Sequence, residues 1–317
     1  MSQTKVYHLP HLDDFLLSMQ VDNRSPETLY NYERDLNVFQ NFLSGAGIDF
    51  EKVDKKAVLN YKAYLTSFDR ATANAQKTQK RLSSYSINRM LSVLRSYLKF
   101  LIKMDYNSPI APTAIELVRK EKRQARVGEL DEIIKLIESP AEFEKDKLVA
   151  GRNRAILETL FATGMRISEL INLKTASIDK TGRVFIIGKG KKERFAYLTP
   201  RARKYIKEYL ELRGANTSPY LFIPSKGRNA EKKDTKLSAN YLQEKIKKYR
   251  ELLGLNIPVS AHGLRHAFAT YMAENGASVA ALQILLGHES LDTTTRYVNA
   301  SAKYAEKIHR QFHPLKD

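Results

Sequence analysis

The sequence predicts a mainly α-helical protein of two domains, with a small β-sheet in the second domain. A chain of 317 residues suggests two domains at roughly 100–200 residues per domain. Apolar residues recur at helical spacings through the first third, whereas the remainder mixes such patterns with two short β-rich runs. We therefore expect an all-α domain over residues 1–106, a linker over residues 107–128 and an α+β domain over residues 129–317.

Helix-start signals define the elements of the first domain. Ser25 followed by Pro26 predicts a helix start, because a hydroxyl N-cap and a proline in the first turn both suit a helix N-terminus. Asp54 is expected to cap a second helix, a third follows Ser84, and a short one covers residues 12–19. The helix after Ser25 carries an apolar stripe made of Leu29, Tyr32, Leu36, Phe39 and Phe42.

In the second domain, helical patterns cover roughly residues 130–138, 150–163 and most of 201–310. Residues 183–187 and 194–198 are β-rich and flank the glycine-containing turn at Gly188, which predicts a hairpin.

The charge balance favours a polyanionic partner. Lys and Arg number 53 against 35 Asp and Glu, which gives a formal net charge of +18. Nucleic acid is the leading candidate, because each phosphate neutralised by Lys or Arg releases counterions. The alternative is a protein that is merely rich in lysine.

The second half of the predicted linker is densely basic. Prolines at 109 and 112 interrupt the helical pattern. A charge run is usually a solvated face, but between two domains of a basic protein it equally suits contact with a DNA backbone. The basic residues are Arg119, Lys120, Lys122, Arg123 and Arg126.

Three absences narrow the function class. The chain has no cysteine, which excludes disulfides, thiol nucleophiles and zinc held by cysteine. The N-terminus has no basic segment followed by an apolar run, and no stretch approaches the roughly 20 apolar residues of a membrane span. We expect a cytoplasmic protein without membrane association.

Six residues carry the candidate chemistry, although each has an ordinary structural alternative. An arginine can cap a helix or pair with a nearby Glu169, a lysine in a hairpin turn is usually exposed, a histidine can cap a helix end, and a tyrosine is by default a packing residue. The six are Arg166, Lys189, His262, Arg265, His288 and Tyr297.

The segment that begins at Ser260 also invites a metal interpretation. His262 and His266 are four residues apart on one helix, as in zinc proteases. The glutamate that such sites require is replaced by Gly263, and neither cysteine nor a carboxylate cluster accompanies the pair. We therefore expect no metal.

Taken together, the six residues suit a phosphodiester. Arginine forks bind non-bridging phosphate oxygens, and His262 and Arg265, three residues apart, share one helix face. A phenol has a pKa of about 10, and neighbouring positive charge favours its phenolate form. Tyr297 is therefore a candidate covalent nucleophile, and no cofactor is expected.

The order Arg, Lys, His-x-x-Arg, His, Tyr resembles the tyrosine recombinases, also called λ-integrase-like recombinases. The strings TGMRISEL, IGKGKKER, HGLRHAFAT and LLGHESLDTTTRYV resemble the Xer branch in particular. Residues 25–36 resemble the start of the family's core-binding domain, so the resemblance covers almost the whole chain. Gly263 departs from many relatives at a position that is not catalytic.

The resemblance implies a role for each of the six. Tyr297 would attack the scissile phosphate and form a 3′-phosphotyrosyl link, and Lys189 would protonate the leaving 5′-oxygen. Arg166 and Arg265 would hold the non-bridging oxygens. The histidines would assist proton transfer at the tyrosine (His262) and hydrogen-bond the phosphate (His288).

The resemblance also implies an assembly. The two domains would form a clamp around double-stranded DNA at a specific recombination site, and four protomers would join two sites. The tetramer could be homomeric or could include a paralogue, and a DNA translocase could activate it. A C-terminal helix over residues 302–309 would dock on a neighbouring protomer, unless it packs on its own domain.

Three other functions remain open. A type IB topoisomerase uses the same chemistry as a monomer, and an architectural DNA-binding protein would carry an inert cluster. A phage or transposon integrase of minimal type would use the same chemistry at other sites. Resolution of chromosome or plasmid dimers is favoured, because no arm-binding domain is evident ahead of the core-binding helices.

Overall fold

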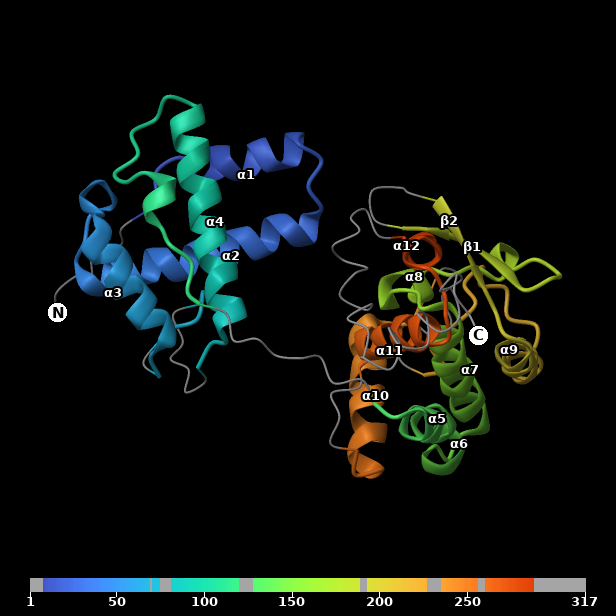
Figure 1. Cartoon of the computed structure of the whole chain (residues 1–317). Coiled ribbons are helices and arrows are strands. Elements are labelled where there is room, and N and C mark those ends of the chain that lie inside the picture. Colours follow the sequence, from blue (N-terminus) through green and yellow to red (C-terminus); the bar gives the residue numbers. More distant parts are fainter. Residues whose placement is uncertain are drawn as a thin grey trace, which may run out of the picture. The chain divides into compact units, whose positions relative to one another are not determined.

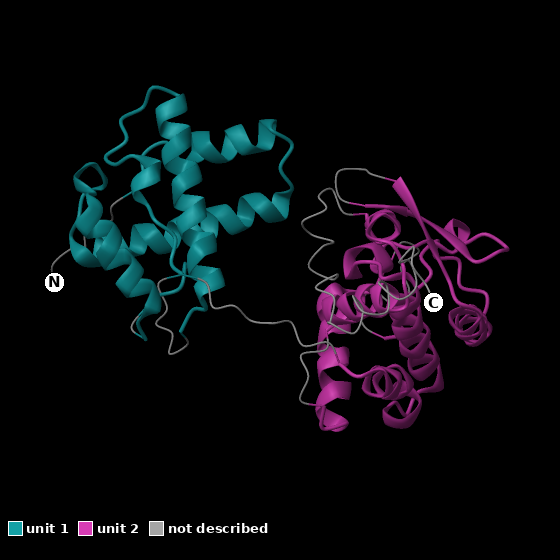
Figure 2. Cartoon of the chain, in the orientation of Figure 1, with its two compact units in different colours: residues 1–124 teal, residues 125–317 magenta. Residues whose placement is uncertain are grey.

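The computed structural model describes residues 8–68, 70–74, 81–119, 128–188, 193–226, 235–255 and 260–287. The chain divides into two compact units, residues 1–124 and 125–317 (Figure 2). The described residues are mostly helical, with a two-stranded antiparallel sheet in the second unit, which confirms the predicted fold class.

Side-chain caps begin three of the described helices of the first unit, at or next to the predicted residues. The Oγ of Ser25 accepts a hydrogen bond from the backbone N–H of Thr28, and Asp54 accepts from Ala57. The third of these helices begins at Ser84 itself, one residue earlier than predicted, because Ser83 accepts from the backbone N–H of Ser86. The helices are α1 (Leu12–Val21), α2 (Pro26–Ala46), α3 (Lys55–Thr66) and α4 (Ser84–Lys103), with short 3₁₀ turns η1 (Phe50–Lys52) and η2 (Pro112–Ala114) (Figure 1).

The core of the first unit lies among α2, α3 and α4. The rings of Phe39 and Tyr61 pack edge to face with centroids 4.8 Å apart, and Leu91 of α4 is fully buried. Ile115, which follows η2, is also fully buried in this core. The predicted linker, residues 107–128, therefore overlaps a segment that packs on the first unit.

The second unit contains the sheet and the remaining helices (Figure 1). Strand β1 (Arg183–Ile187) pairs antiparallel with β2 (Glu193–Tyr197), and the register places Phe185 opposite Phe195, as expected for a hairpin. The other elements are α5 (Leu130–Glu138), α6 (Pro140–Phe143), α7 (Lys147–Thr163), α8 (Ile167–Ile171), η3 (Thr175–Ser177), α9 (Pro200–Arg213), α10 (Ala239–Leu252), α11 (Ala261–Glu274) and α12 (Val279–Leu286).

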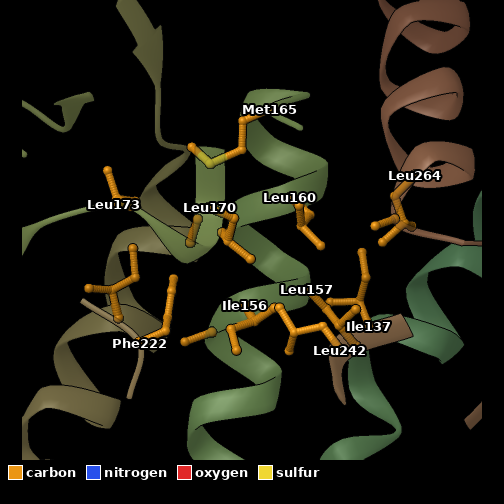
Figure 3. Close-up of a cluster of buried hydrophobic side chains, with 14 of the residues drawn as sticks. Ile137, Ile156, Leu157, Leu160, Met165, Leu170, Leu173, Phe222, Leu242 and Leu264 are labelled. Atoms are coloured by element: carbon orange, nitrogen blue, oxygen red, sulfur yellow. The ribbon is translucent and has the colours of Figure 1, made fainter. Parts of the chain in front are cut away.

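Helix α7 organises the core of the second unit. Leu157 and Leu160 of α7 are buried beside Leu170 of α8, Leu242 of α10 and Leu264 of α11 (Figure 3). Burying such a side chain contributes about 1.5–3 kcal/mol relative to exposure. Because this packing fixes α8 and α11 against α7, it also fixes the polar residues at the ends of these helices.

Within the described ranges, no helix is long and apolar enough to cross a membrane.

Candidate active site

Three of the six candidate residues lie in the described parts of the second unit, at the starts of two helices. Arg166 is the N-cap residue of α8, two residues after Gly164 ends α7. His262 and Arg265 lie in the first turns of α11, which begins where Ser260 accepts a hydrogen bond from the backbone N–H of Gly263.

Gly164 allows α7 and α11 to approach closely. Its φ is 60°, in the left-handed region that favours glycine. A Cβ atom at this position would also lie 2.4 Å from the ring of Phe268 on α11. Any larger residue would therefore push α11, which carries Arg265, away from the end of α7.

Arg265 is buried at the junction of α7, α11 and α12, with only 2% of the residue exposed. Its Nη1 donates to the carbonyl oxygen of Gly164 at 2.7 Å, and its Nη2 donates to that of Leu286 at 2.7 Å. The end of a helix carries unpaired carbonyls and partial negative charge, so a cation is stabilised there.

Arg166 reaches the same helix end from α8. Its Nη1 donates to Glu169 Oε1 at 2.9 Å, and its Nη2 lies 3.4 Å from the carbonyl oxygen of Gly287. Its backbone N–H donates to Glu169 Oε2 at 2.7 Å. The side chain is 35% exposed, so it is also accessible to a ligand. Arg166 therefore both caps α8 and forms an ion pair with Glu169, the two structural roles that were considered as alternatives to catalysis. The same arrangement brings Arg166 close to Arg265.

A third arginine, which sequence reasoning missed, completes the cluster. Arg194 of β2 donates from Nη1 and Nη2 to the two oxygens of Glu169, both at 2.8 Å. Its Nε donates to the carbonyl oxygen of Leu285 at 3.0 Å. The signal was the strand alternation, which places position 194 on the buried face together with Ala196.

Glu169 binds both Arg166 and Arg194 while almost fully buried. Burial alone would raise the pKa of its carboxyl group. Hydrogen bonds from Arg194 and from the Arg166 backbone, together with the positive charges of both side chains, outweigh this effect and lower the pKa. The carboxylate therefore stays ionised, and the cluster of Arg166, Glu169 and Arg194 keeps a net charge of +1.

His262 shares this positive environment. Desolvation by the surrounding protein lowers the pKa of its imidazole, and the charges of Arg265 and then Arg166 lower it further. The residue is still exposed, so its ring remains accessible. A neutral imidazole at neutral pH can accept a proton, which a protonated one cannot.

The other predicted residues are only partly covered by the structure. Lys189, His288 and Tyr297 lie outside the described residues, although Gly188 and Gly287, which precede two of them in sequence, are described. In the basic segment only Arg119 is described, and it is exposed; the predicted residues beyond it are Lys120, Lys122, Arg123 and Arg126. The residues that the structure describes contain no group of three or more His, Asp or Glu that could hold a metal ion.

Comparison with known families identifies the chain. The Phage integrase family model matches residues 127–303, which is more than half of the sequence. The Phage integrase, N-terminal SAM-like domain model matches residues 12–104. The chain belongs to the phage integrase family. Members of this tyrosine recombinase family cleave and rejoin DNA through a phosphotyrosine intermediate, and this chain is a site-specific recombinase of that kind.

Full-length relatives point to the Xer recombinases. Tyrosine recombinase XerD of Staphylococcus epidermidis is 31% identical over 96% of this chain and 98% of its own length. Tyrosine recombinase XerC of Pelobacter propionicus is 34% identical over 95% of this chain and 94% of its own. The chain is therefore a Xer-like phage integrase family member.

Solved structures share the fold of this recombinase. The XerH recombinase bound to its difH substrate before cleavage matches with a TM-score of 0.69 and 22% identity, covering 93% of this chain and 82% of that one. A λ integrase dimer bound to a core site matches with a TM-score of 0.68 and 17% identity, covering 90% of this chain and 75% of that one.

Proposed function

We propose that this recombinase resolves chromosome or plasmid dimers at a specific DNA site, with Tyr297 as the nucleophile. The supporting observation is the convergence of two guanidinium groups on consecutive carbonyls: Arg265 donates to Leu286, and Arg166 lies against Gly287. Position 288, the predicted phosphate-binding histidine, follows these carbonyls directly in the sequence. Preorganised donors of this kind stabilise the charge that develops on a phosphorus centre.

In the proposed reaction, the phenol oxygen of Tyr297 attacks the phosphorus atom, and the bond to the 5′-oxygen breaks. His262 takes the phenol proton, and Lys189 supplies a proton to the 5′-oxygen, which leaves as a hydroxyl. Arg166 and Arg265 bind the non-bridging oxygens, and His288 hydrogen-bonds one of them. A 5′-hydroxyl of the partner duplex then attacks the phosphotyrosine, and the same steps run in reverse.

This route conserves the phosphodiester bond energy in the covalent intermediate. Each cleavage exchanges a phosphodiester for a phosphotyrosyl ester, so the reaction calls for neither ATP nor a metal ion. The lowered pKa of His262 suits its role, because the imidazole is then neutral and ready to accept a proton.

We further propose that the protein acts on double-stranded DNA as a tetramer. Relatives support this: XerH was solved on difH DNA, and a λ integrase tetramer was solved on a Holliday junction. The tetramer would contain this chain alone or together with a paralogue, and a DNA translocase would activate it. The basic residues between 119 and 126 would contact the DNA backbone, and the site of action would be the cytoplasm, where bacterial chromosomes and plasmids lie.

Covalent trapping tests the nucleophile. A duplex nicked next to the cleavage position loses a short 5′-hydroxyl fragment after attack, so the protein stays attached and migrates slowly on a denaturing gel. The wild type should form this adduct and Tyr297→Phe should not, while both bind the duplex equally. Tyr304→Phe is the matched control and should react like the wild type. An adduct that persists in Tyr297→Phe but disappears in Tyr304→Phe would reassign the nucleophile.

A further inference from the structure

We propose that Arg194 is a positioning residue of the cleavage site: it neutralises Glu169 so that the charge of Arg166 remains directed at the scissile phosphate, and it fixes the end of α12. This inference rests on the proposed function, because it concerns how the same phosphate-binding arginines are held.

The shared carboxylate is the first argument. Glu169 Oε1 accepts from Nη1 of Arg166 at 2.9 Å and from Nη1 of Arg194 at 2.8 Å. Oε2 accepts from the Arg166 backbone at 2.7 Å and from Nη2 of Arg194 at 2.8 Å. The two guanidinium groups therefore divide one carboxylate between them, and Arg194 holds the larger share because it binds both oxygens through its fork.

Removal of Arg194 would change what Arg166 faces. Glu169 has a side chain only 4% exposed, so its charge is weakly screened by solvent. Without Arg194, the guanidinium of Arg166 would be the remaining ionic partner of Glu169 among the described residues, and the net charge of these three side chains would fall from +1 to zero. Arg166 would then be drawn toward Glu169 and offer less positive charge to a phosphate.

The end of α12 provides the second argument. Three consecutive carbonyl groups there accept from three different arginines: Leu285 from Arg194, Leu286 from Arg265 and Gly287 from Arg166. Gly287 also packs on Arg194 so closely that a Cβ atom there would lie 2.9 Å from the Cδ of that arginine. Arg194 therefore sets the position of the carbonyls on which both phosphate-binding arginines rest.

Arg194 itself is placed to support and not to touch DNA. Its side chain is only 7% exposed, and each of its three guanidinium nitrogens already has a protein acceptor. Its effect on the reaction must then pass through Glu169, Arg166 and the end of α12.

Substitution by lysine separates charge from geometry. Arg194→Lys keeps one positive charge but cannot bind both oxygens of Glu169 and the carbonyl of Leu285 together. We expect the single-turnover rate constant for adduct formation on the nicked duplex to fall about 10–100-fold, as misplacement of a reacting group by about 1 Å does. The final adduct yield and the protein concentration at half-saturation should stay within about threefold of wild type.

The matched control is Arg201→Lys. Arg201 also joins two acidic side chains of the same unit, Glu158 at 2.7 Å and Glu138 at 2.8 Å, but none of these bonds involves Arg166. The Arg201→Lys variant should leave the rate constant for adduct formation unchanged. If Arg194 were merely structural, Arg194→Lys would lower the adduct yield through an unfolded fraction and leave the rate constant of the folded fraction intact, which would overturn the proposal.

A substrate with sulfur at the 5′-bridging position identifies the step affected. Its leaving group needs no proton, so Lys189→Ala should be largely rescued on it. Arg194→Lys should show the same defect on both substrates, because their non-bridging oxygens are identical. Rescue of Arg194→Lys by the sulfur would instead mean that the substitution affects protonation of the leaving group, which would overturn the link to Arg166.

The proposed function and this inference can fail separately. A wild type that forms no adduct would refute the proposed function. If the wild type and Arg194→Lys form the adduct with equal rate constants, only this inference is refuted.

Discussion

Arg265 donates through Nη2 to the carbonyl oxygen of Leu286 at 2.7 Å, which ties the start of α11 to the end of α12. Since Nη1 of the same group binds Gly164 at 2.7 Å, a single planar cation holds the ends of two helices. Only guanidinium has donors spread widely enough for this arrangement, because the donors of lysine lie on one atom.

The first prediction follows for Arg265→Lys. The ammonium group can bind one of the two carbonyls but not both, so the phosphate-binding geometry and the packing are lost together. We expect adduct formation to slow by about a hundredfold or more. Single-turnover trapping measures this loss. Arg203→Lys is the control, because Arg203 also donates to two carbonyls, those of Thr181 and Lys180, yet its side chain is on the exposed face of α9, so the variant should react normally.

The second prediction concerns His262 and pH. Burial and the charges of Arg265 and Arg166 lower the pKa of its imidazole below the ordinary value of 6.5. Because the neutral ring is the proton acceptor, the cleavage rate constant should be flat from neutral pH down to below 6.5 and fall only when the ring becomes protonated. His262→Gln should be slow at every pH and lack this acid limb. If the fall of the rate constant at acid pH persists unchanged in His262→Gln, the titrating group is a residue other than His262.

The third prediction concerns Glu169 and stability. Its folded-state pKa is lower than the ordinary value of 4.5, so its ionised form stabilises the folded state above pH 4.5 and this contribution disappears as the pH falls through the folded-state pKa. Glu169→Gln leaves Arg194 buried without its counter-charge and should cost about 3–5 kcal/mol at neutral pH. Urea unfolding should show that the difference from wild type shrinks in acid. A difference independent of pH would contradict the ion-pair interpretation.

The fourth prediction separates backbone strain from contact at Gly164. Gly164→Ala combines φ of 60° with a Cβ atom 2.4 Å from Phe268. Gly254, which follows α10 in the same unit, has a similar φ of 64° but nothing within 4 Å of the added atom, so Gly254→Ala measures the strain alone. Gly164→Ala should be less stable than Gly254→Ala by about 1–3 kcal/mol, the usual cost of overpacking. Equal thermal unfolding shifts would mean that α11 moves freely, contrary to the close packing observed.

Local signals in the sequence predicted much of the fold. Ser25 and Asp54 start helices because their side chains bond to backbone N–H groups a few residues away, and such bonds depend only on neighbouring sequence. The hairpin follows in the same way from the β-rich runs over residues 183–187 and 194–198 on either side of the glycine turn. The packing of Ile115 in the core of the first unit was not predicted. The prolines at 109 and 112 interrupt the helical pattern, which is typical of an interdomain linker.

The candidate site was foreseen only where its residues are close in sequence or match the family strings. The spacing of His262 and Arg265 places both on one face of α11, and Arg166 pairs with Glu169 within α8. Arg194 could not be foreseen as a partner of Glu169, because the contact joins positions 25 residues apart through the fold of the hairpin onto α8. The hydrogen bonds from three arginines to three successive carbonyls depend on how α12 packs on the rest of the unit. No local sequence pattern encodes that packing.

The row of carbonyls at the end of α12 also restricts how this segment can vary. Each of Leu285, Leu286 and Gly287 faces a different arginine, and a helix advances by about 100° of rotation per residue. Insertion or deletion of a single residue within α12 would rotate the carbonyls out of register and present every arginine with the wrong oxygen. The number of residues in α12 thus determines which carbonyl oxygen meets which arginine. We expect homologous chains to tolerate side-chain substitutions along this helix far more readily than changes in its length.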